Sequence, residues 1–79
     1  MTRRPTKHSL TLNGHRTSVS LEDAFWKAFR DIATRRQIPI NALAAEIDAD
    51  RGIDCGLASA IRLFVLIDLQ DQLKLQISD

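Results

Sequence analysis

The residues best suited to chemistry lie near the amino terminus, where polar and apolar side chains alternate. Arg16, Ser18 and Ser20 occupy every second position of one such run. An arginine can donate two hydrogen bonds to guanine O6 and N7, and a serine hydroxyl can donate or accept one. Because successive side chains of a strand point to opposite faces, these three residues are expected on one face. The sequence therefore offers a strand face whose chemistry is competent to contact base edges.

Charge is segregated along the chain although the net charge of its 79 residues is only +1. Residues 1–36 contain eight basic and three acidic residues, a net charge of +5, whereas residues 37–79 have a net charge of −4. A basic segment can neutralise phosphates and release their counterions. An acidic segment is better suited to face water or another protein. We therefore expect the two halves to have different roles.

A hairpin is predicted over residues 7–21, after a flexible basic arm at residues 1–6. Asn13 and Gly14 separate two alternating runs, and this dipeptide is a strong signal for a two-residue turn. The apolar face then pairs Leu12 with His15, Leu10 with Thr17 and His8 with Val19, and it continues to Leu21. The opposite face comprises Lys7, Ser9, Thr11, Arg16, Ser18 and Ser20.

Three helices are predicted after the hairpin, over residues 22–36, 39–50 and 57–75, followed by a tail at 76–79. Apolar residues recur at helical spacing in each segment. Ser20 precedes two acidic residues, so its hydroxyl is equally suited to cap the first helix and to contact a base. Pro39 ends the first helix and suits the first turn of the second.

The third predicted helix is apolar around almost its whole circumference, so it requires burial on several sides. A single short chain offers little to cover it. Part of this helix is therefore expected to pack against a second copy. Arg62 interrupts the apolar pattern, and we expect it to pair with a carboxylate such as Glu46 or Asp48 within the dimer, because a buried charge requires a partner.

Several other classes of protein are disfavoured. Cys55 is the only cysteine, and its separation from His8 and His15 gives no metal-ligand spacing, so neither a metal nor a cofactor is expected. No nucleophile lies beside an identifiable base, so we expect no enzyme. The longest apolar run, Leu63–Ile67, is too short to cross a membrane. With no signal peptide pattern, a cytoplasmic location is expected.

The runs His15–Glu22, Asn41–Leu43 and Ala60–Val65 resemble a subfamily of short bacterial ribbon-helix-helix domains, over roughly residues 7–69. The resemblance implies a mainly α fold with an amino-terminal β-ribbon, here with an additional carboxy-terminal helix, that forms an intertwined homodimer. It places Val19 and Leu21 in the dimer core. With the apolar positions of the helices, the expected dimer core comprises Val19, Leu21, Phe25, Phe29, Leu43, Ile47, Ile61, Phe64 and Val65.

The resemblance also implies a function, namely a transcriptional regulator, a repressor or an antitoxin-like protein, whose ribbon enters the major groove of double-stranded DNA. Arg16, Ser18 and Ser20 would then contact bases. The amides of Ile40, Asn41 and Ala42, at a helix amino terminus, would clamp a phosphate, and Lys7 would contact another. Pro39 departs from the family pattern, where a capping serine or threonine is usual. The alternative is a protein-interaction module on the same scaffold.

Overall fold

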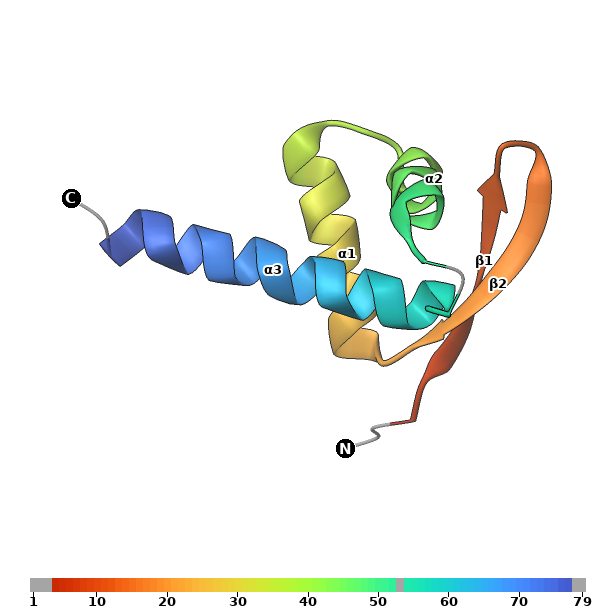
Figure 1. Ribbon diagram of the computed structural model, residues 1–79, viewed down its shortest axis with the longest axis horizontal. Coiled ribbons are helices and arrows are strands. Elements are labelled where there is room, and N and C mark those ends of the chain that lie inside the picture. Colours follow the sequence, from red (N-terminus) through yellow and green to blue (C-terminus); the bar gives the residue numbers. More distant parts are fainter. Residues whose placement is uncertain (1–3, 53, 78–79) are drawn as a thin grey trace.

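A two-stranded ribbon precedes three helices in the computed structural model, which describes residues 4–52 and 54–77 (Figure 1). The elements are β1 (Thr6–Leu12), β2 (His15–Leu21), α1 (Asp23–Arg36), α2 (Ile40–Asp50) and α3 (Leu57–Ile77). This order confirms the predicted class, a β-ribbon followed by helices with an additional carboxy-terminal helix. Helix α3 begins beside the hairpin, crosses α1 and extends past it (Figure 1).

The hairpin has the predicted register. Strands β1 and β2 are antiparallel, with Leu12 opposite His15, Leu10 opposite Thr17 and His8 opposite Val19. The turn residues Asn13 and Gly14 have φ values of 53° and 85°. Two consecutive residues with positive φ form the type I′ turn, whose twist matches that of the flanking strands. Asparagine and glycine tolerate this conformation best, so the turn fixes the register.

The core lies between the apolar face of the hairpin and the helices. Leu10, Leu12, Val19 and Leu21 are buried there. The helices contribute Phe29, Ile32, Ala33, Leu43, Ala44, Ile47, Ile61 and Val65. Of the nine residues predicted for a dimer core, seven are buried within this one chain, and Phe25 and Phe64 are half-buried against the same cluster. Seven of them are therefore buried without a second copy, whereas Phe25 and Phe64 are only partly covered.

His8 and Trp26 join the hairpin to α1 at the margin of the core. Their rings are stacked, with centroids 3.9 Å apart and planes inclined by 7°. The Nε2 atom of His8 is buried and has no hydrogen-bond partner among the described residues. Trp26 also contacts Phe29, with the ring centroids 6.1 Å apart. The contact extends the core to the open end of the hairpin.

The helix ends differ from the sequence expectations in ways that affect the site. Helix α1 begins after Glu22, and the structure shows no side-chain cap for it in the described residues. Ser20 is the penultimate residue of β2, so the prediction that it caps α1 is wrong. Strand β2 continues through Leu21 because the side chain of Leu21 is buried in the core. Helix α1 therefore begins too late in the chain for the Ser20 hydroxyl to cap it. Helix α3 continues to Ile77, two residues beyond the predicted end.

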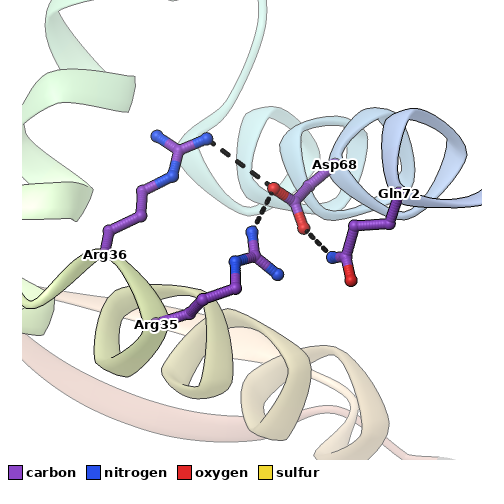
Figure 2. Close-up of polar contacts among 4 residues, drawn as sticks. All are labelled: Arg35, Arg36, Asp68 and Gln72. Atoms are coloured by element: carbon purple, nitrogen blue, oxygen red, sulfur yellow. Dashed lines mark hydrogen bonds and ion pairs between the residues drawn. The ribbon is translucent and has the colours of Figure 1, made fainter. Parts of the chain in front are cut away.

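Asp68 ties α3 to the end of α1 (Figure 2). Its side chain is 8% exposed and accepts a hydrogen bond of 2.6 Å from Arg35 Nη2 and another of 2.6 Å from Gln72 Nε2. Arg36 Nη2 lies 3.6 Å from the same carboxylate. A buried carboxylate requires such partners, since its desolvation is otherwise costly. Arg35 and Arg36 therefore reach toward α3, although both side chains stay nearly half exposed.

The core predicts the effect of a truncation at its centre. Phe29 is fully buried, so Phe29→Ala should lower the free energy of unfolding by about 3–5 kcal/mol. The matched control is Leu75→Ala, whose side chain is 77% exposed, and its effect should be within about 0.5 kcal/mol. Urea unfolding at one fixed protein concentration measures both. A loss below about 1 kcal/mol for Phe29→Ala would contradict this core.

Candidate nucleic-acid interface

The outer face of the hairpin gathers the polar residues that the alternation predicted. Across the ribbon, Lys7 is opposite Ser20, Ser9 is opposite Ser18, and Thr11 is opposite Arg16. All six side chains are exposed. The structure therefore brings Arg16, Ser18, Ser20 and Lys7 onto one continuous face. Ser9 and Thr11 share this face, and the same alternation in β1 already identifies them.

This face is basic. Lys7 and Arg16 lie on it four strand positions apart, which corresponds to about 13 Å along the ribbon. Arg4, just before β1, is exposed as well. No acidic residue occurs in the sequence before Glu22. The nearest acid in sequence beyond it, Asp23, accepts a hydrogen bond of 3.2 Å from the Thr6 hydroxyl at the start of β1. The face is thus suited to a polyanion.

The outer edge of β2 is available for pairing. In a hairpin with a two-residue loop, the residues beside the loop exchange both backbone hydrogen bonds, and such pairs alternate with pairs that exchange none. The backbone groups of Arg16, Ser18 and Ser20 therefore point away from β1. Within the described residues the sheet contains only β1 and β2, so no strand lies beside this edge. An open edge of this kind is a template for another strand.

The amino terminus of α2 lies beside the other edge of the ribbon. Asn41 Oδ1 accepts a hydrogen bond of 3.1 Å from the Thr11 amide on β1. The helix begins with a bond from the Leu43 amide to the Pro39 carbonyl, so the amides of residues 40–42 precede it. Pro39 is the N-cap, without a side-chain cap bond in the described residues. The contact made by Asn41 was not predicted, since sequence spacing does not show that α2 docks on β1.

Arg62 connects α3 to the junction of β2 and α1. Its Nε and Nη2 atoms donate to the two Glu22 carboxylate oxygens at 2.9 and 3.2 Å. Nη2 also lies 3.4 Å from the Ser20 carbonyl. The prediction that Arg62 pairs with Glu46 or Asp48 is wrong, because α3 crosses the start of α1 and turns Arg62 toward Glu22. Asp48 instead forms an ion pair with Arg51 at 2.6 Å.

The Arg62 guanidinium lowers the pKa of Glu22 below its ordinary value of 4.5. Hydrogen bonds from Arg62 are the main cause, and a backbone hydrogen bond at Glu22 acts in the same direction. Both favour the ionised carboxylate. The ion pair therefore fixes the end of β2 only while Glu22 is charged.

This pair predicts a pH dependence of stability. A carboxylate with a lowered pKa in the folded protein stabilises it above its unfolded pKa, and this contribution disappears as the pH falls through the folded value. Wild type should therefore be more stable than Glu22→Gln at pH 7, and the difference should shrink as the pH drops below about 4.5. Urea unfolding from pH 3 to 7 measures it.

The control is the same substitution in an Arg62→Met background, where the guanidinium that lowers the pKa is absent. In this background, the effect of Glu22→Gln on the free energy of unfolding should be nearly the same at every pH from 3 to 7. An equally strong pH dependence in this background would show that Arg62 is not its cause.

A second surface feature is apolar instead of basic. A groove of about 420 Å³ between α2 and α3 is lined mainly by apolar side chains, among them Ile47, Leu63 and Phe64. The described residues contain no group of three or more potential metal ligands. No helix in the described part of the chain is long and apolar enough to cross a membrane.

A β-ribbon joined directly to short helices, with an exposed basic face, defines a small ribbon-and-helix domain. Comparison with protein families matches residues 5–69 to the ribbon-helix-helix domain, so the chain belongs to this family. Ribbon-helix-helix domains are typically found in DNA-binding transcription regulators, are usually dimeric and are generally not enzymatic. Neither the comparison with curated proteins nor that with solved structures gives a match.

Proposed function

We propose that this protein is a dimeric, sequence-specific DNA-binding regulator of the cytoplasm, acting as a repressor or an antitoxin-like protein. The observation that carries the proposal is the outer hairpin face, which is exposed, basic and without acidic residues. The family supports it, since its members typically bind DNA. The apolar face of the same hairpin is buried, so only the polar face remains for a ligand.

The dimer forms by pairing of β2 with β2 of a second copy. The outward backbone groups of Arg16, Ser18 and Ser20 supply the hydrogen bonds of an antiparallel pair. A twofold axis makes such an interface self-complementary, because each strand offers the other the same edge. The product is a four-stranded sheet in which the two β2 strands are central and the two β1 strands are outermost.

This strand order gives β1 and β2 different roles when the sheet binds DNA. Four strands spaced about 4.8 Å apart are about 14 Å wide between the outer strand axes, against about 12 Å for the major groove. The central pair therefore faces the base edges with Arg16, Ser18 and Ser20. The outer strands lie toward the phosphates, where Lys7 contributes its charge.

The amino termini of the two α2 helices flank this sheet. The Asn41 side chain holds each terminus against the outer edge of β1, on the side where a phosphate backbone runs. The amides of Ile40, Asn41 and Ala42 are available at a helix end with positive dipole character, which favours an anion. Because Pro39 supplies neither an amide nor a hydroxyl, these three amides form the clamp without a capping side chain.

Arg16 supplies the test of base contact. Arg16→Ala should weaken binding to selected DNA by about fivefold to a hundredfold for each half-site and should relax sequence preference, since a bidentate contact to guanine contributes about 1–3 kcal/mol. Wild type is first used to enrich fragments from a pool of fluorescent genomic DNA at several salt concentrations. Binding of both proteins to the enriched fragments is then compared with binding to random fragments.

Lys74→Ala is the matched control, since it removes one positive charge from the far part of α3 and should leave selectivity unchanged. Circular dichroism and sedimentation first establish that each variant folds and associates as wild type does. Retention of full selectivity by Arg16→Ala would exclude Arg16 as a base contact. Failure of wild type to retain DNA at low salt would overturn the proposed function.

Lys7 should act differently, because a phosphate contact carries no sequence information. Lys7→Ala should weaken binding to selected and random DNA by the same factor. The slope of log K against log salt should fall in magnitude by about 2 for the dimer, one contact from each protomer. Titrations at four or more salt concentrations measure the slope. A selective loss on the enriched fragments alone would place Lys7 at a base instead.

A protein-interaction role is the second candidate, and the exposed apolar residues of α3 favour it. Leu63, Leu66, Ile67, Leu69 and Leu73 are each about half exposed. A partner protein on this surface would not require the basic hairpin face. The salt-dependent DNA titration distinguishes the two roles, since a module of this kind would bind no DNA at any salt concentration.

A further inference from the structure

One row of leucines follows the exposed side of α3. Leu66, Leu69 and Leu73 are 49%, 51% and 56% exposed. Their spacing of three and then four residues is that of the a and d positions at which two helices pack together. The buried side of α3, with Ile61, Val65 and Asp68, contacts the rest of the protomer. The row therefore forms a second apolar side of α3, which its own chain leaves half exposed.

The leucine row lies on the same side of the protomer as the open edge of β2. Arg62 precedes Leu66 by four residues, so its side chain begins the same row one helical turn earlier. Arg62 Nη2 reaches the Ser20 carbonyl, which points outward from the edge of β2. The row therefore continues from the strand edge along α3. A partner that pairs with β2 meets the leucines as well.

The direction of α3 determines how two copies of the row would meet. Figure 1 shows α3 beginning beside β2 and running away from the hairpin. A twofold axis that relates two antiparallel β2 strands is perpendicular to their sheet. The axis therefore leaves the hairpin in the same general direction as α3. Two α3 helices related by this axis point in the same direction. Each leucine then lies opposite the same leucine of the other copy.

We propose that Leu66, Leu69 and Leu73 form a parallel two-helix seam with α3 of a second copy. The proposal rests on the ribbon dimer of the proposed function and adds a second contact surface to it. Leu73 lies beyond residue 69, where the family match ends. Part of the seam therefore lies outside the matched residues.

The residues beside the row favour an identical partner. In a parallel pair of helices, the e and g positions that flank the seam of one helix face the g and e positions of the other, and like charges there would repel. Here these positions include Gln70 and Gln72, which are uncharged. The charged residues Asp71 and Lys74 fall elsewhere on the helix. From Leu66 to Leu73 the seam is thus apolar with uncharged flanking positions, so charge repulsion does not oppose self-association there.

Single cysteines test both the contact and its direction. In a Cys55→Ser background, Leu66→Cys, Leu69→Cys and Leu73→Cys are made one at a time and oxidised. In a parallel seam each residue meets its own copy, so all three variants should form disulfide-linked dimers, which require Cα atoms within about 7 Å. Leu75→Cys, on another side of α3, is the control and should stay unlinked. Linkage of only one of the three would indicate antiparallel helices and overturn the proposal.

A charge in the seam tests its contribution to association. Leu69→Lys should raise the dimer dissociation constant at least about tenfold. Leu75→Lys, the same change at a more exposed leucine, should leave it unchanged. Sedimentation equilibrium measures both, and circular dichroism verifies the fold. An unchanged dissociation constant for Leu69→Lys, with no linkage of the three cysteine variants, would overturn the seam.

The two proposals fail in different ways. If the cysteine variants form disulfide-linked dimers but wild type binds no DNA, the seam is supported and the DNA-binding function is overturned. If wild-type dimers bind DNA through Arg16 but no cysteine variant forms a disulfide-linked dimer, the seam is overturned and the DNA-binding function is supported. A wild type that sediments as a monomer at high concentration would overturn both, because each requires the second copy.

Discussion

The register of the hairpin is the constraint on which the rest of the structure depends. The Asn13-Gly14 turn pairs Leu12 with His15, and this pairing sends every apolar side chain of the ribbon to one face and every basic one to the other. A slip of one residue would exchange the faces, since side chains alternate with period two. The same register decides which backbone groups point outward from β2. The core, the basic face and the open edge therefore share one cause.

Much of this arrangement could be predicted from the sequence because it is local. The turn dipeptide and the alternation around it are sufficient to assign Arg16, Ser18 and Ser20 to one exposed face, and helical spacing is sufficient for the core positions of α1, α2 and α3. One incorrect prediction is local, the capping of α1 by Ser20, because strand β2 continues through Leu21. The other concerns the approach of distant segments. Arg62 contacts Glu22 because of the angle at which α3 crosses α1. This angle cannot be predicted from the spacing of residues within either helix.

The same limit explains Asp68 and Asn41. Asp68 follows Ile61 and Val65 on the buried side of α3, a placement that shows the need for a cationic partner but does not say which. The structure supplies Arg35 and Arg36 from α1. These two arginines contribute to the positive charge of the amino-terminal half, yet they serve the packing of α3. The basic character of the outer surface therefore depends more on the hairpin than the charge count of residues 1–36 suggests.

The stacking of His8 on Trp26 gives the molecule an intrinsic optical reporter. Trp26 is the only tryptophan of the chain, and its indole ring lies on the underside of the ribbon, opposite the basic face. Tryptophan fluorescence therefore reports whether the ribbon is packed against the helices, and no attached dye is needed. A change at the ribbon can thus be followed from the side of the sheet opposite the proposed DNA contact.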